Sequence, residues 1–249
     1  MIKIENTKIE GWEPAIRSMR NPMNSWSKSD SYELCGDGDF GSPYFVGPND
    51  QKLMKQLRDA GKDHAKYRRM ITVWMDVTGP FYWWKEFETY KVGTVSNSCS
   101  TMHKIAAKEF TLDDFSYEHL IEGRPDIFNM FDTPEEPKEL GAYRVDFGYS
   151  ESGDEWWEGQ FAMDILRETI EALNGYRKLY LETKDKKYWW QLIQLLPSSY
   201  NQKRTIMLNY EVLANIYHAR KDHKLDEWHT FCDWAKGLPE SWIFTGEDA

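Results

Sequence analysis

The sequence predicts a mixed α/β fold of the α+β kind, with strands early in the chain and helices dominating its second half. Two observations lead to this prediction. The run Ile71–Val77 alternates apolar and polar residues and is rich in β-branched side chains, as expected for a half-buried strand. After residue 160, apolar residues recur at helical spacing, and no regular alternation of strand and helix is visible.

The other elements follow in chain order. Residues 1–5 alternate like a strand, Pro14–Arg20 is predicted as a helix, and Gln51–Ala60 as an amphipathic helix that ends at Gly61. Thr78-Gly79-Pro80 ends the strand at 71–77, and Phe81–Phe87 follows as a helix dense in aromatic residues. Further helices are predicted over Asp164–Thr183, Tyr188–Leu196, Ile206–Arg220 and Asp226–Trp234.

A single domain is expected over residues 1–249, because no linker rich in Gly, Ser or Pro divides the chain. Residues 105–160 mix acidic loops with short apolar runs and are expected to form an enlarged loop or insert. Aromatic residues make up 15% of the chain, including 12 Trp. This surplus fits either a thick core with subunit interfaces or a site for flat ligands.

Charge and cysteine content exclude several classes of function. The net charge of −10 argues against a nucleic-acid duplex as partner, although a single nucleotide needs only a few local cations. Three widely spaced cysteines indicate a reducing compartment, and no residues have the spacing of a metal site. No apolar stretch is long enough to span a bilayer, so we expect a cytoplasmic protein without a membrane partner.

Two segments have the composition of ligand-binding sites. In a helix over 206–220, Asn209 and Arg220 are eleven positions apart and return to within roughly 20° of each other. The alternative is that Asn209 is hydrogen-bonded in the core and Arg220 only marks the helix end. The segment Lys91–Lys104 presents small hydroxyl and amide side chains between lysines, which suits an anionic phosphate, but it also suits an ordinary polar loop.

Together with what joins them, these segments resemble the flavin-dependent thymidylate synthase family. The family signature R-H-R-x-x-S-x-N-x-x-S-x-R follows a strand, an apolar-Pro break and an aromatic helix; here Thr89–Lys104 follows the same three elements. His64 lies sixteen residues before Pro80, as in the family. Downstream, Leu196-Pro197 precedes a match to the family pattern N-x-R-x-x-x-N-x-x-x-x-R that retains both Asn residues and the last Arg. The resemblance covers most of residues 1–104 and 160–240.

The resemblance implies a central, twisted, mostly antiparallel sheet flanked by long helices, and a homotetramer whose sites lie between subunits. It implies reductive methylation at C5 of dUMP or a variant pyrimidine nucleotide, with FAD as cofactor and NADPH and methylenetetrahydrofolate as co-substrates. By position, the flavin would be bound by His64, Lys91, Asn209 and Asn215. The nucleotide would be bound by Glu86, Asn97, Ser100 and Arg220, with Arg220 as the catalytic residue that stabilises negative charge on the pyrimidine.

Several cations of the family pattern are replaced. Thr89-Tyr90-Lys91 stands for R-H-R, and Met102 replaces the closing arginine, for which His103 or Lys104 are candidate substitutes. Glu211 replaces the arginine between the two asparagines, and Arg69 replaces a family acid, so these two are candidates for an ion pair. Two hypotheses follow: a divergent enzyme with reduced activity, or a non-catalytic homologue that keeps the fold and tetramer and binds a nucleotide or another partner without flavin.

Overall fold

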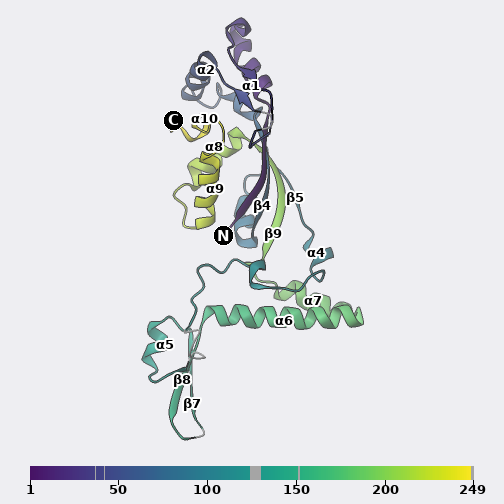
Figure 1. The fold of residues 1–249 in the computed structure, drawn as a ribbon, viewed down its shortest axis with the longest axis vertical. Coiled ribbons are helices and arrows are strands. Elements are labelled where there is room, and N and C mark those ends of the chain that lie inside the picture. Colours follow the sequence, from purple (N-terminus) through teal and green to yellow (C-terminus); the bar gives the residue numbers. More distant parts are fainter. Residues whose placement is uncertain (37, 42, 124–129, 151, 248–249) are drawn as a thin grey trace. The chain divides into compact units, whose positions relative to one another are not determined.

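A computed structural model describes residues 1–36, 38–41, 43–123, 130–150 and 152–247 (Figure 1). The chain divides into two compact units, one made of Met1–Cys99 with Gln202–Ala249 and the other of Ser100–Asn201. The enlargement expected at about 105–160 falls within the second unit. The single-domain assignment stays a prediction, because two compact units can still unfold as one cooperative body.

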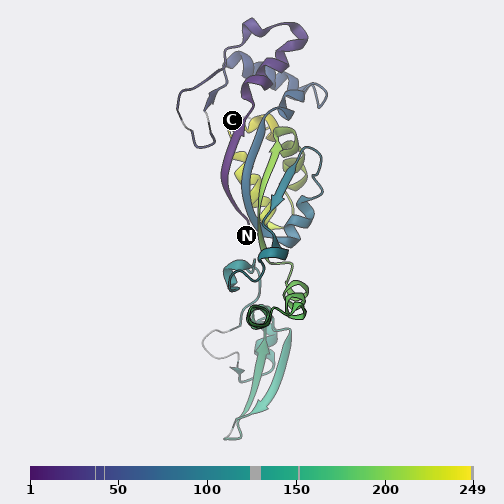
Figure 2. The same ribbon diagram turned by 90° about the vertical axis from the view of Figure 1, so that its right-hand side faces the viewer.

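The first unit is built on a four-stranded sheet in the order β1 (Lys3–Glu10), β4 (Thr72–Pro80), β9 (Asn201–Asn209), β5 (Val95–Ser98). The pairs β1–β4 and β5–β9 are antiparallel. Figure 2 shows the strands side by side in a twisted layer. Along β4, buried and partly exposed residues alternate, as a strand covered on one face requires. The predicted antiparallel sheet is confirmed.

Helices of the first unit share one apolar core with this sheet. They are α1 (Trp12–Arg20), α2 (Pro48–Asp59), α3 (Phe81–Phe87), α8 (Tyr210–Arg220), α9 (Asp226–Lys236) and α10 (Trp242–Thr245). The rings of Trp83 and Phe87 in α3 pack on Trp228 of α9 at centroid distances of 5.1 and 6.3 Å. Much of the aromatic surplus is therefore core, where large rings bury the most apolar surface. A two-stranded ribbon, β2 (Tyr32–Glu33) and β3 (Tyr44–Phe45), follows α1.

The second unit has a separate core. Its elements are α4 (Thr101–Lys104), β6 (Met130–Phe131), α5 (Glu135–Glu139), β7 (Arg144–Tyr149), β8 (Glu155–Gln160), α6 (Ala162–Thr183) and α7 (Lys186–Leu195). The strands form an antiparallel sheet in the order β6-β8-β7. Leu166 and Leu173 of α6 pack with Leu192 of α7 in a cluster of buried apolar residues. The expectation of long helices is met most fully here, since α6 has 22 residues and α8 and α9 have 11 each.

The helix predicted over Ile206–Arg220 is wrong in its first four residues. Residues up to Asn209 belong to β9, and α8 begins only at Tyr210. Ile206, Met207 and Leu208 form a short apolar run whose periodicity does not separate strand from helix, and pairing with β5 decides the matter. Asn209 and Arg220 therefore do not share a helical stripe. The other predicted helices are present, with bounds that differ by a few residues.

Candidate functional site

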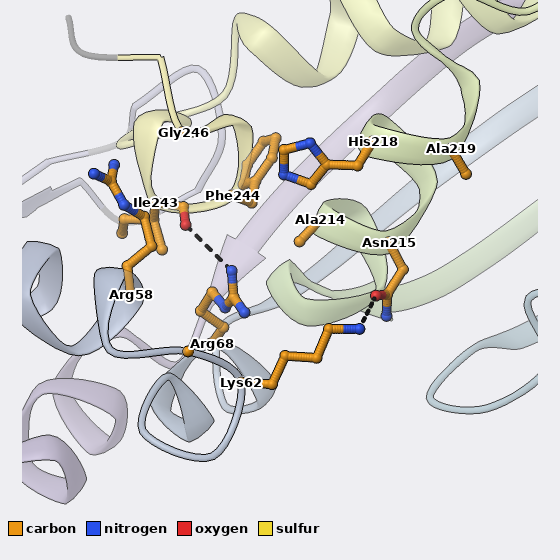
Figure 3. A pocket seen from close by; sticks show the side chains of 11 residues that line it. Arg58, Lys62, Arg68, Ala214, Asn215, His218, Ala219, Ile243, Phe244 and Gly246 are labelled. Atoms are coloured by element: carbon orange, nitrogen blue, oxygen red, sulfur yellow. Dashed lines mark hydrogen bonds between the residues drawn. The ribbon is translucent and has the colours of Figure 1, made fainter.

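The first unit contains a cavity of about 570 Å³ next to α8 and α10 (Figure 3). Its polar lining comes from the end of α2 and the turn after it, from the segment before β4, and from α8. The lining residues are Arg58, Gly61, Lys62, Arg68, Ala214, Asn215, His218, Ala219, Ile243, Phe244 and Gly246. The volume lies within the range of about 300–1,000 Å³ that is usual for small-molecule sites.

Three cations line this cavity, and two of them are neutralised. Nε of Arg58 lies 2.8 Å from Oδ1 of Asp59, and Nη2 of Arg68 lies 2.7 Å from Oε2 of Glu211. Lys62 differs, because its Nζ donates to the side-chain oxygen of Asn215 at 3.3 Å and forms no ion pair within the described part of the chain. Lys62 is thus the cation whose charge remains available to an anionic ligand.

The Arg68–Glu211 pair corrects an expectation. Glu211 was expected to pair with Arg69, but it pairs with the neighbouring Arg68, and Arg69 is exposed. Arg68 and Glu211 are only 7% and 8% exposed, and such a pair is stable in the interior only because each charge compensates the other. Glu211, which the resemblance sets in the place of an arginine, is therefore paired with a cation that lines the cavity and is not an isolated negative charge.

Glu86 and Arg220 lie together at a second place, between α3, α8 and α9. Nη1 of Arg220 donates to Oε2 of Glu86 at 2.8 Å, and its Nε donates to the hydroxyl of Tyr90 at 2.9 Å. The indole Nε1 of Trp228 donates to the same glutamate oxygen at 3.1 Å, and the guanidinium carbon of Arg220 lies 4.8 Å from the Trp228 ring centre. Nε2 of His223 is 3.5 Å from that oxygen. Nε and Nη1 of Arg220 are thus both hydrogen-bonded to protein groups.

Asn209 caps α8. Its side-chain oxygen accepts hydrogen bonds from the N–H groups of Glu211 and Val212 at 3.1 and 3.0 Å, which satisfies donors that the first turn of a helix leaves open. Its amide nitrogen lies next to Gly93, at 3.3 Å from where a Cβ on that glycine would be. The cap thus lies beside the loop that follows Lys91.

The remaining predicted site residues are on the surface. His64, Lys91 and Asn97 are exposed, with Asn97 on the edge strand β5 opposite Thr205 of β9. Ser100 is also exposed and lies in the second unit. Its hydroxyl accepts from the N–H of His103 and caps α4.

The structure therefore brings together Glu86 and Arg220, and it places Asn215 in the cavity. Asn215 and Arg220 are five residues apart on α8, so they point about 140° apart around the helix axis. The sequence interpretation missed Arg58, Lys62 and Arg68. The available signal was a run of basic residues between 58 and 69 in an otherwise acidic chain.

Within the described ranges of the chain, no helix is long and apolar enough to cross a membrane. Within the same ranges, no three His, Cys, Asp or Glu side chains gather in a way that could hold a metal ion.

Comparison with solved structures identifies the fold. Thymidylate synthase X from Helicobacter pylori, in a structure with FAD and dUMP, matches with a TM-score of 0.60 and 13% identity over 100% of this chain and 98% of that chain. The UMP/dUMP methylase PolB from Streptomyces cacaoi, bound with 5-Br dUMP, matches with a TM-score of 0.54 and 13% identity over 99% and 94%. No family model and no curated protein matches the sequence. The chain has the fold of the flavin-dependent thymidylate synthases.

Proposed function

We propose that this protein is a flavin-dependent thymidylate synthase-like enzyme that acts at C5 of a pyrimidine nucleotide, either dUMP or a variant substrate, with activity below that of its structural relatives. It would work in the cytoplasm as a homotetramer, with FAD as cofactor and NADPH and methylenetetrahydrofolate as co-substrates. The observation that supports this most is the cavity lined by Lys62 and Asn215, in a chain with the fold of proteins solved with FAD and dUMP.

The residues of this cavity fit a flavin cofactor. Lys62 supplies an unneutralised cation for an anionic group, and Asn215 supplies an amide that both donates and accepts hydrogen bonds. Phe244 and Ile243 add apolar wall for a flat ring. Bound FAD would supply the hydride chemistry, and the protein would supply orientation and charge. Asn209 would act on the same ligand indirectly, because it fixes the start of α8.

The nucleotide would bind at the Glu86–Arg220 cluster. A substrate that needs the Arg220 guanidinium has to compete with Glu86, which accepts from it at 2.8 Å. That competition costs binding energy, because the displaced carboxylate must find water or another donor. Together with the loss of cations at Thr89, Tyr90 and Met102, it accounts for the reduced activity that we propose.

A second candidate function is a homologue that binds a nucleotide or another partner without flavin and without turnover. The engagement of Arg220 by Glu86, Tyr90 and Trp228 favours it, because a structural cluster of this kind needs no substrate. The two candidates differ in one measurable property, which is flavin binding.

The first experiment is a titration of the purified protein with FAD, followed by the flavin absorbance bands and by calorimetry. Under the enzyme proposal FAD binds, and Lys62→Met weakens it by about tenfold or more, as expected for one charge-assisted contact. Lys52→Met is the matched control, since Lys52 is exposed on α2 outside the cavity. Equal loss in both variants would place the flavin elsewhere, and no FAD binding at all would favour the second candidate.

The second experiment is complementation of a bacterial strain that requires thymidine. We expect weak growth or none, because three family cations are replaced by Thr89, Tyr90 and Met102. Each charge-assisted contact contributes about 1.5–3 kcal/mol, so partial compensation by Lys62 would leave a deficit of several orders of magnitude. Robust growth without thymidine would show that the replacements are functional equivalents.

A further inference from the structure

A histidine that the proposed function does not use lies at the Glu86–Arg220 cluster. His223 is in the turn between α8 and α9, and its Nε2 lies 3.5 Å from Oε2 of Glu86. That oxygen already accepts from Nη1 of Arg220 at 2.8 Å and from the indole Nε1 of Trp228 at 3.1 Å. Three nitrogen atoms therefore face one carboxylate oxygen, and the imidazole nitrogen is the most distant of them.

The turn holds the imidazole in a defined orientation. The backbone N–H of His223 donates to the carbonyl of Arg220 at 3.0 Å, and its Nδ1 accepts from the N–H of Leu225 at 3.2 Å. The ring also meets the Trp228 ring edge-on at a centroid distance of 6.3 Å. Because Nδ1 accepts a hydrogen bond, the neutral imidazole carries its proton on Nε2, the atom that faces Glu86.

The turn alone does not account for a histidine at this position. An acceptor for the N–H of Leu225, two residues further on, is a role that Asn, Asp and Ser side chains commonly fill in turns. What the imidazole adds is a second nitrogen on the far side of the ring, and this nitrogen is the one directed at Glu86. The donor at Nε2 is therefore the feature that needs an explanation.

Nucleotide binding at Arg220 would leave one contact to be replaced. It would take the donor at 2.8 Å away from Glu86, and a carboxylate that loses a hydrogen bond without a substitute weakens the complex. We propose that His223 is a positioning residue, whose Nε2–H donates to the Glu86 carboxylate when the nucleotide takes Arg220. The inference rests on the proposed function, and it supplies the donor that the displaced carboxylate needs.

The exchange requires only a small movement. Hydrogen bonds between nitrogen and oxygen span about 2.7–3.2 Å, so Oε2 of Glu86 has to move toward His223 by roughly half an ångström. Nε of Arg220 donates to the hydroxyl of Tyr90 at 2.9 Å, and the guanidinium carbon lies 4.8 Å from the Trp228 ring centre. These two contacts keep the guanidinium in place while Nη1 changes its partner.

Two substitutions separate the roles of the two ring nitrogens. His223→Asn keeps an acceptor for the N–H of Leu225 but has no atom at the position of Nε2. His223→Gln places an amide N–H near the position of Nε2 but gives up the acceptor in the turn. In calorimetric titrations of the full chain with dUMP and with UMP, the Asn variant should bind about fivefold more weakly, as expected for one lost hydrogen bond to a charged group. The Gln variant should bind within about twofold of the unaltered protein.

Stability should follow the opposite order, which separates positioning from a role in the turn. The urea midpoint should fall for His223→Gln and stay unchanged for His223→Asn, because only the Asn variant retains the acceptor for Leu225. His229→Asn is the matched control, since His229 is exposed on α9 and lies beside Asp226. This control should leave nucleotide affinity unchanged.

The contrary outcomes are distinct. Equal affinity of His223→Asn and the unaltered protein would show that water alone replaces Arg220 at Glu86, and would overturn the inference while leaving the proposed function in place. An affinity loss in His223→Gln that matches the loss in His223→Asn would also overturn it. No binding of dUMP or UMP by the unaltered protein would overturn the proposed function and this inference with it.

A double-mutant cycle in two backgrounds tests the exchange without nucleotide. The cycle combines His223→Asn with Glu86→Gln, and urea unfolding gives their coupling. In an Arg220→Ala background, Glu86 has lost the same donor that the nucleotide would remove. The coupling between His223 and Glu86 should therefore be about twice or more its value in the presence of Arg220. A coupling that Arg220→Ala leaves unchanged would overturn the proposal.

Discussion

Nη1 of Arg220 donates to Oε2 of Glu86 at 2.8 Å and so joins α8 to α3 across 134 residues of sequence. The same carboxylate oxygen accepts from the indole of Trp228 in α9 at 3.1 Å, so a single acceptor connects three helices. Because Arg220 also lies 4.8 Å from the Trp228 ring centre, its charge is held by both an anion and a π-face. The cluster therefore connects the three helices whether or not a substrate also binds to it.

The first prediction follows from this cluster. A double-mutant cycle of Glu86→Ala and Arg220→Ala should give a coupling free energy of about 1 kcal/mol, since the Glu86 side chain is 35% exposed and solvent screens part of the attraction. Urea unfolding measures it. Lys85→Ala, a neighbouring exposed residue on α3, is the control and should show no coupling to Arg220. Strictly additive losses for Glu86 and Arg220 would mean that the pair adds no stability of its own.

A second prediction concerns two glycines with positive φ. Gly11→Ala should destabilise the protein by about 2–4 kcal/mol, because it combines an unfavourable φ of +94° with a collision against the Met70 carbonyl. Gly61→Ala should cost only about 1–2 kcal/mol, because its φ is +101° but no atom lies within 4 Å of the added Cβ. Urea midpoints for both variants test this. Equal losses would show that the corner between β1 and α1 can relax.

A third prediction concerns acid stability at Asp50, which is fully buried and lies 2.6 Å from Nε of Arg20. Burial alone would raise the pKa of this carboxyl. Hydrogen bonds from the hydroxyls of Ser31 and Ser29, from Arg20 and from the N–H of Asp30 outweigh that effect and hold the pKa below its usual value. Since the folded pKa is the lower one, Asp50 stabilises the fold above its unfolded pKa of about 3.9, and this contribution is lost as the pH falls further through the folded pKa.

Asp50→Asn should therefore cost about 3–5 kcal/mol at pH 7, since it leaves the buried Arg20 without its counter-ion. The gap between wild type and variant should narrow as the pH falls below about 4. Guanidinium unfolding midpoints at several pH values measure the gap, and Asp59→Asn, at an exposed position on α2, serves as the control. A gap that stays constant down to pH 3 would contradict the lowered pKa.

A fourth prediction is the homotetramer that the family resemblance implies. The edge strand β5 has no charged residue and all of its residues are exposed, and Val92 just before it is 93% exposed. Edges of this kind are normally covered or charged in a monomer. Light scattering at micromolar concentration should give about four times the chain mass of 29.5 kDa, whereas a particle of 29.5 kDa would contradict the prediction.

The sequence by itself determined those elements whose patterns have one physical solution. The alternating run at Ile71–Val77 indicated a half-buried strand, and the helix Phe81–Phe87 has the predicted bounds. The expected break at Thr78-Gly79-Pro80 was wrong, because β4 continues through these residues to Pro80. The spacing of Asn209, Asn215 and Arg220, together with the segment before it, was specific enough to indicate the fold that the structural matches show. Local periodicity and the spacing of residues within a segment can be read from one sequence, because neither depends on contacts with distant parts of the chain.

Tertiary structure alone decided everything that depends on partners distant in sequence. Ile206–Leu208 lie in a strand because β9 pairs with β5. Asn209 therefore caps α8 and does not lie on a helix face, as the sequence had predicted. Glu211 pairs with Arg68 and not with Arg69, because Arg68 is buried and the adjacent Arg69 is exposed. Lys62 entered the cavity because the turn after α2 brings it to Asn215, 153 residues away. Such pairings depend on the path of the folded chain, and no local pattern encodes them.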